Sequence, residues 1–124
     1  MNCAIGTGEA EYYENPKDTY RNTFVKEFAD KWKSTEWELT STRKIKLKPL
    51  SEVFEDNNIT HVDFMSIDVE TFEDVVLNSN DWNKYKANVL CIEGSGYNYL
   101  KKYGYRWAFW DGNNTYYKLK RFVV

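Results

Sequence analysis

Three carboxylates in the sequence stand at positions where they could accept a proton or contact a cofactor. Asp68 and Glu70 follow the apolar run 61–67, and Glu93 follows a second apolar run at 88–92. In open α/β sheets, ligands bind just beyond the carboxyl ends of the parallel strands, so acids there are candidates for general acid–base catalysis. Two alternatives are a hard cation such as magnesium held by an acid pair, and acids that only favour the positive end of a following helix.

The segment 61–94 predicts one βαβ unit that would position these acids. Both of its apolar runs show little alternation, as in parallel strands that are buried on two faces. The roughly twenty residues between the runs are enough for a helical crossover and too many for a hairpin. Thr71 is expected to cap the intervening helix, around 73–78, with Asp74 three residues further on.

The rest of the chain predicts short elements around this unit. Alternation indicates strands at 9–13 and 42–48, which we expect to pair, because the lysines of the second complement the acids of the first. Those lysines could instead contact an anionic substrate or protect an edge strand from mispairing. A strand at 2–6 would precede them, followed by a hairpin turn at Gly6-Thr7-Gly8. The other predicted elements are helices at 23–33, 50–56 and 97–103 and a hairpin with strands at 105–110 and 115–122 around the turn 111–114.

The acidic segment also carries a family resemblance. The run Phe64-Met65-Ser66-Ile67-Asp68-Val69-Glu70, followed by Glu73 and Val76-Leu77, resembles the strand-four signature of FkbM-like S-adenosylmethionine-dependent methyltransferases. Thr71 stands where this family usually has glycine. Further similar segments lie at 2–9, 50–54, 81–82, 88–93, 104–105 and 111–117, so the resemblance covers nearly the whole chain.

The resemblance implies an α/β fold in one domain, 1–124. It would be a partial Rossmann-like sheet of the class I methyltransferase type, mixed with a C-terminal antiparallel hairpin. In the family, the sheet order is three-two-one-four-five-seven-six. The first two strands and the Gly-rich cofactor turn would precede Asn2, which makes this a truncated domain. The strand at 62–67 would then be an exposed apolar edge. We expect the early strands, a second copy or an upstream segment to cover it.

In functional terms, the resemblance implies methyl transfer from S-adenosylmethionine to a hydroxyl of a sugar or small metabolite. Asp68 would lie nearest the methyl donor, with Glu70 and Glu93 on the acceptor side. Ala4, Thr23 and Asp68 are the residues implied to bind the cofactor. Thr23 could instead cap the helix that follows it. The alternative for the whole chain is a non-catalytic remnant that serves as an interaction or oligomerisation module.

Composition narrows the possible binding partners and cellular location of the protein. The 124 residues carry a net charge of -2, which gives no electrostatic case for nucleic acid or an anionic membrane. The sequence shows neither a membrane-spanning run nor a signal pattern, and we expect a cytoplasmic protein.

Cys3 and Cys91 lie in predicted strands and are expected to be buried free thiols, and His61 is expected to be structural. The aromatic C-terminal hairpin could stack on nucleic acid or sugar, but it lacks a basic groove and is interpreted as a core hairpin with an aromatic rim.

Overall fold

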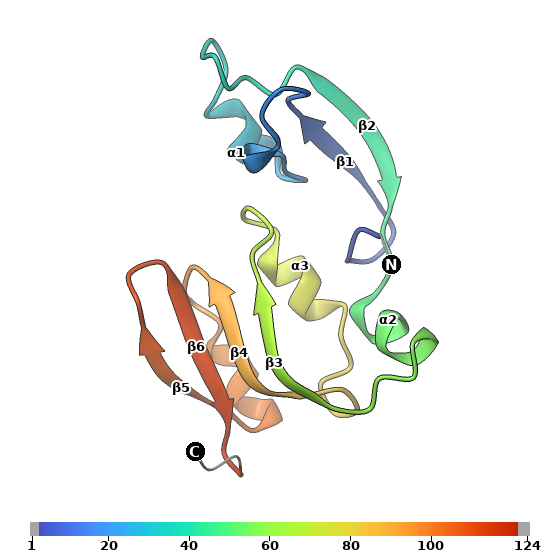
Figure 1. The fold of residues 1–124 in the computed structure, drawn as a ribbon, viewed down its shortest axis with the longest axis vertical. Coiled ribbons are helices and arrows are strands. Elements are labelled where there is room, and N and C mark those ends of the chain that lie inside the picture. The colour runs from blue at the N-terminus through green and yellow to red at the C-terminus, as the bar shows by residue number, and fades with distance from the viewer. Residues whose placement is uncertain (1–2, 122–124) are drawn as a thin grey trace. The chain divides into compact units, whose positions relative to one another are not determined.

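The protein is a mixed α/β structure with two sheets and short helices. A computed structural model describes residues 3–121 (Figure 1). By its internal contacts the chain divides into two compact units. Unit 1 consists of Met1–Pro49 and Val69–Ser79, and unit 2 consists of Leu50–Asp68 and Asn80–Val124. No described helix has the length and apolar character needed to cross a membrane.

Unit 2 is built on a four-stranded mixed sheet. Its strands are β3 (Val62–Ile67), β4 (Ala87–Glu93), β5 (Tyr105–Trp110) and β6 (Asn114–Leu119), in the order β3-β4-β6-β5. β3 and β4 are parallel, whereas β6 pairs antiparallel with both β4 and β5. This confirms the predicted parallel pair and the C-terminal hairpin. The order also agrees with the order that the family resemblance implies for its last four strands.

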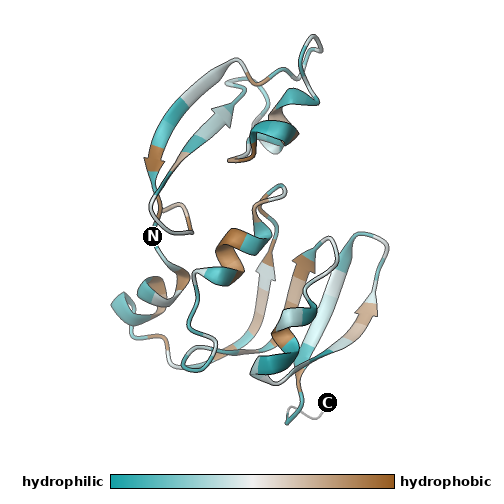
Figure 2. Cartoon of the chain, turned by 180° about the vertical axis from the view of Figure 1, so that it is seen from behind, coloured by the Kyte–Doolittle hydropathy of each residue, from teal (hydrophilic) through white to brown (hydrophobic). Residues whose placement is uncertain are grey.

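The prediction that both parallel strands are buried on two faces is wrong for β3. This strand lies at the edge of the sheet, and Phe64 in its middle is 56% exposed. β4 lies between two neighbours, is mostly buried and is more hydrophobic than β3 (Figure 2). The apolar run at 62–67 therefore forms the exposed apolar edge that the sequence predicted, and within residues 3–121 no second strand pairs with it.

The core of unit 2 lies on one face of this sheet. The side chains of Leu90 and Ile92 are fully buried there, together with Leu100 from the 3-10 helix η2 (Asn98–Tyr103). Tyr105 is also fully buried, and its ring lies edge-on to Trp82 at a centroid distance of 5.7 Å. The remaining helix of this unit is α2 (Leu50–Asp56). η2 is followed by Gly104, whose φ is 93°, so the end of the helix predicted at 97–103 is confirmed, although the helix is of the 3-10 type.

Unit 1 contains a two-stranded sheet and three short helices. β1 (Glu9–Glu14) and β2 (Ser41–Lys46) pair antiparallel, and Glu9 lies opposite Lys46 while Glu11 lies opposite Lys44. This register confirms the predicted pairing of acids with lysines. The helices are η1 (Thr19–Arg21), α1 (Lys26–Asp30) and α3 (Glu73–Asn78), and α1 is shorter than the helix predicted at 23–33.

Three predictions about the N-terminal residues need correction. The strand at 2–6 is not formed by residues 3–6, because Ile5 makes only an isolated parallel bridge with Lys48. Gly6-Thr7-Gly8 is therefore a bend that leads into β1, not the turn of a hairpin. Cys3 is exposed, whereas Cys91 is buried as expected, and both are free thiols. Asn2 and Phe122 lie outside the described residues.

Candidate functional site

Two of the predicted site residues meet at the carboxyl ends of β3 and β4. Ile67 and Ile92 are register partners in the parallel pair, so Asp68 and Glu93 follow at the same rim of the sheet. A carboxylate oxygen of Asp68 lies within 4.8 Å of one from Glu93. Asp68 is exposed and Glu93 is half-buried. The two carboxylates therefore form an acidic pair, and an approaching hydroxyl could give up its proton to the exposed Asp68.

The backbone on the Glu93 side is held by hydrogen bonds within unit 2. The Tyr97 hydroxyl donates to the carbonyl of Glu93, and the Thr115 hydroxyl donates to the carbonyl of Gly94 at 2.5 Å. The amide of Gly94 donates to the carbonyl of Asn113 at 2.9 Å. The segment that carries Tyr97 and the β5–β6 hairpin therefore both hold the chain directly after β4, so the Glu93 side chain starts from a fixed position. The sequence places Tyr97 only at the start of the helix predicted at 97–103, and it cannot reveal the role of Thr115, which lies 21 residues from Gly94.

The loop after Asp68 carries backbone strain. Glu70 and Thr71 both have left-handed backbones, with φ of 49° and 72°. A β-branched residue such as threonine rarely adopts this conformation. The prediction that Thr71 caps α3 is therefore wrong: its hydroxyl donates to the carbonyl of Glu70 at 2.6 Å, and Phe72 occupies the N-cap position. Instead, the buried Glu73 accepts a hydrogen bond from the amide of Val69 at 2.9 Å.

This strain explains why glycine would suit the position of Thr71, and it gives a test. We expect Thr71→Gly to raise the free energy of unfolding by about 1 kcal/mol, because a left-handed backbone costs an L residue about 1–2 kcal/mol and glycine much less. Urea denaturation of the two chains measures the difference. Thr60→Gly is the matched control, since Thr60 is exposed and has no left-handed backbone. Equal changes in both variants would contradict the strain.

Thr23 is buried in unit 1 and is connected to the loop that carries Glu70. Its hydroxyl donates to the carbonyl of Glu70 at 2.8 Å and accepts from the amide of Val25 at 3.1 Å. Its backbone pairs with that of Tyr13 in an isolated bridge. α1 begins only at Lys26, so Thr23 does not act as its N-cap. The side chain orients the strained backbone at Glu70, and its contact with a cofactor stays a prediction.

Ala4 lies in the wall of a cavity in unit 1. The cavity has a volume of about 440 Å³ and is lined by Cys3, Ala4, Tyr12, Phe24, Arg43 and Ile45. The rings of Tyr12 and Phe24 are 4.8 Å apart, and the ring of Phe24 is 5.0 Å from that of Phe72. Arg43 lies 5.6 Å from the centre of the Tyr12 ring while it binds both carboxylate oxygens of Glu14. The wall can therefore take up a flat, uncharged ring.

The aromatic part of this wall was not predicted as a site. The sequence places Tyr12 only within the alternating strand predicted at 9–13, and Phe24 only within the helix predicted at 23–33. Both patterns indicate which face is apolar, but neither shows that residues 12 and 24 come together around Ala4. That contact depends on the turn between β1 and α1, where Asn15 accepts from the amide of Lys17 at 2.8 Å.

Neither a curated protein nor a solved structure was found to match the chain. The family model of the methyltransferase FkbM domain matches residues 1–111, and this protein therefore belongs to the FkbM methyltransferase family.

Proposed function

We propose that the chain takes part in O-methylation that depends on S-adenosylmethionine, with a hydroxyl of a sugar or small metabolite as acceptor. Family membership implies methyl transfer and a methyl-donor cofactor. The observation that carries the finer proposal is the pair of carboxylates, Asp68 and Glu93, at the open end of two parallel strands. We also propose that the sheet of unit 2 is part of a Rossmann-like methyltransferase fold, which its strand order supports.

The carboxylate pair supports transfer to oxygen in particular. A hydroxyl is a weak nucleophile until its proton is taken up during the reaction, and a positioned carboxylate can supply that function. When bound, S-adenosylmethionine would supply a methyl group on a positively charged sulfur, which departs as a neutral thioether. The acceptor oxygen gains the methyl group while its proton passes to Asp68. The exposed position of Asp68 leaves room for such an acceptor.

The cavity of unit 1 supports the choice of methyl donor. Its volume of about 440 Å³ lies in the range of small-molecule sites, and its aromatic rings suit an adenine base. Ala4 contributes a small side chain to the wall, which leaves space for a flat ring. On this proposal the residues of the cavity hold the base of the cofactor, and Arg43 is kept in place by Glu14.

Calorimetric titration with S-adenosylhomocysteine, the product that keeps the adenosine group, tests the cofactor. We expect heat of binding with a dissociation constant of about 1 µM to 1 mM, where the Michaelis constants of enzymes usually lie. Ala4→Trp fills the cavity and should abolish the signal. Tyr20→Trp is the control, because Tyr20 is 86% exposed and lies outside the cavity wall. Absence of heat from the unaltered chain, or equal binding by Ala4→Trp, would contradict the proposal.

A further inference from the structure

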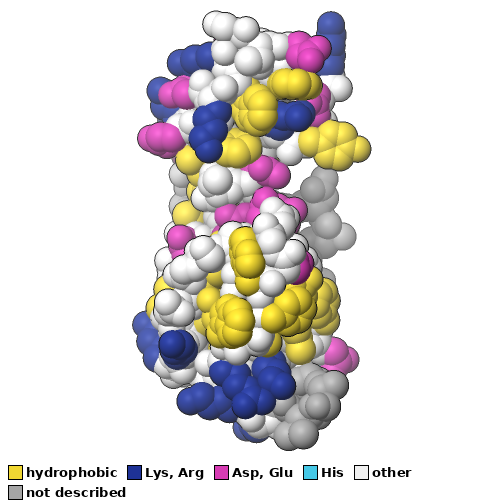
Figure 3. All heavy atoms as spheres, turned by 90° about the vertical axis from the view of Figure 1, so that its left-hand side faces the viewer, with side chains coloured by type: hydrophobic (Ala, Val, Ile, Leu, Met, Phe, Trp, Pro, Cys, Tyr) yellow, Lys and Arg dark blue, Asp and Glu magenta, His cyan; other side chains and the backbone are white. Residues whose placement is uncertain are grey.

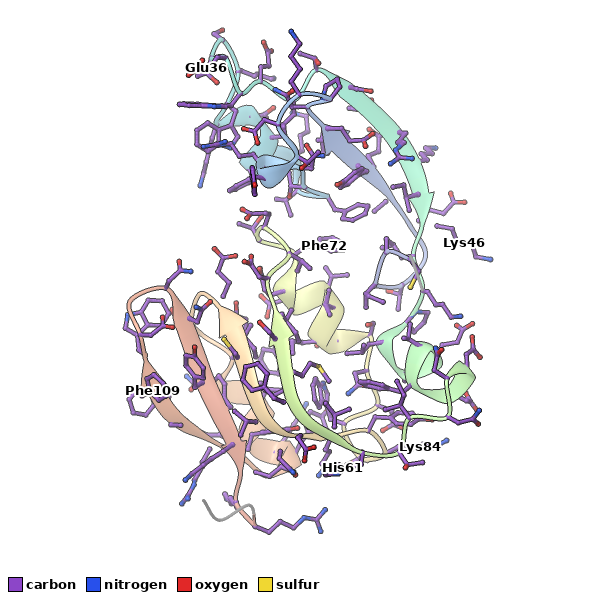
Figure 4. All side chains as sticks on the ribbon, viewed as in Figure 1. Glu36, Lys46, His61, Phe72, Lys84 and Phe109 are labelled. Carbon is purple, nitrogen blue, oxygen red and sulfur yellow. The ribbon has the colours of Figure 1, made fainter. Side chains whose placement is uncertain are left out.

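One face of the unit 2 sheet is apolar and is exposed at its two edge strands, β3 and β5. Residues that are register partners point to the same face, which places Phe64, Val89 and Cys91 together with Tyr116 and Phe109. Phe64 is 56% and Phe109 50% exposed, and the ring of Phe109 stacks on that of Tyr116 at 4.3 Å. Figure 4 shows Phe109 on the edge strand β5. Single exposed apolar residues are ordinary, but a group that spans all four strands indicates an interaction surface.

The charges of this face lie at two of its corners. Arg106 of β5 and Lys118 of β6 are register partners at one end, in line with Val89. Asp68 and Glu93 lie on the same face, just beyond the carboxyl ends of β3 and β4. They are therefore at the opposite end of the strands, and at the opposite side of the sheet, from Arg106 and Lys118. On the side of the β5–β6 hairpin, lysine and arginine side chains adjoin exposed hydrophobic ones (Figure 3). The basic and acidic corners are therefore diagonal to each other.

The two exposed aromatic residues mark the other diagonal. Phe64 belongs to the edge strand β3 and Phe109 to the opposite edge strand β5. A twofold axis along this second diagonal leaves both apolar corners on the axis and exchanges the basic corner with the acidic one. The face is thus complementary to itself, as a symmetric dimer requires.

We propose that this face binds a second copy of the chain. In the resulting dimer, Arg106 and Lys118 of one copy lie against Asp68 and Glu93 of the other, and the aromatic residues on the axis pack against their own counterparts. Charge complementarity sets the orientation of the two copies, and burial of the apolar centre provides the driving force. The acidic corner is also the proposed site of proton uptake, so formation of the dimer would cover that site.

Sedimentation velocity over a range of chain concentrations tests the dimer without any methyl donor, so its outcome is independent of the proposed function. We expect a monomer–dimer equilibrium. Arg106→Glu should raise the dimer dissociation constant by about tenfold or more, since it places like charges together at two symmetric contacts. Phe64→Ser should do the same through the apolar centre. Both residues are exposed, so neither substitution should disturb folding.

The diagonal arrangement predicts a specific rescue. Arg106→Glu combined with Asp68→Arg should restore the dimer, because the exchanged charges meet again across the axis. Lys101→Glu is the matched control: it makes the same change of charge on η2, outside this face, and should leave the equilibrium unchanged. A monomer at every concentration, an unaffected Arg106→Glu variant or a failed rescue would overturn the proposal. So would a monomer that binds oligonucleotides through Arg106 and Phe109.

Discussion

Asp68→Asn is expected to lower kcat/KM for methyl transfer by about 10²–10⁴-fold, the usual contribution of a positioned general base. The amide keeps the size of the side chain but cannot take up the acceptor proton. Asp68 is the appropriate residue to change because it is exposed at the end of β3 and close to Glu93. The loss should fall mainly on kcat, because the hydroxyl must lose its proton only as the new bond forms.

The control for this variant lies on β3, the strand that Asp68 follows. Asp63 is also exposed, and its carboxylate contacts His61 at 2.7 Å and Asn88 at 3.3 Å. Asp63→Asn makes the same chemical change, but far from the carboxyl end of β3, and should leave kcat/KM unchanged. Steady-state kinetics with a hydroxylated acceptor, together with circular dichroism to confirm folding, measures the effect. Equal activity of the two variants would remove Asp68 from the proposed reaction.

Tyr105→Phe is expected to lower the free energy of unfolding by about 2–4 kcal/mol, because it deprives two buried backbone groups of a partner, each worth about 1–3 kcal/mol. The Tyr105 hydroxyl donates to the carbonyl of Ala87 at 2.6 Å and accepts from the amide of Ala87 at 2.9 Å. Both residues are fully buried, so water cannot replace the hydroxyl. These bonds connect the start of β4 to β5. Tyr20→Phe, at an exposed tyrosine, should change nothing in the same urea titration.

The pH dependence of the free energy of unfolding gives a second test of the role of the Tyr105 hydroxyl. Burial raises the pKa of its hydroxyl above the ordinary value of 10.0. A pKa that is higher in the folded state gives stability that is fully present below pH 10 and is lost as the pH rises above it. Tyr116, with a pKa raised to about 12 chiefly by its hydrogen bond to Cys91, and Tyr117, raised by burial, act in the same direction. Tyr105→Phe should therefore weaken the alkaline loss of stability without removing it. An unchanged alkaline profile would contradict this reasoning.

The central part of the fold could be predicted because its signals are local. The apolar runs that became β3 and β4, and the distance between them, fix a parallel pair, and the acids that follow each run must then share a rim. The alternation of lysines likewise predicted the partner of β1. The family model, which matches residues 1–111, confirms the family that the acidic segment resembles. The sites themselves stay predictions, since the structure gives their geometry and not their activity.

The errors have a common cause, which is that tertiary contacts override local preference. Thr71 has the type and spacing of a helix cap, but the turn after Asp68 gives it a left-handed backbone, and Phe72 takes the N-cap position of α3. The run at 62–67 is apolar enough for a central strand, and only the sheet order shows that it lies at an edge. The chain at 3–6 is held by Lys48, whose distance in sequence no periodicity can reveal.

The discontinuous make-up of unit 1 has a practical consequence for dissecting the protein. Residues 69–79 belong with the first 49 residues, so the polypeptide passes from one unit to the other three times. Neither half can be released by a single proteolytic cut, and a clone that stops at Pro49 would lack α3 and the loop that binds Thr23. A faithful excision of unit 1 would require residues 69–79 to be spliced on through an artificial linker.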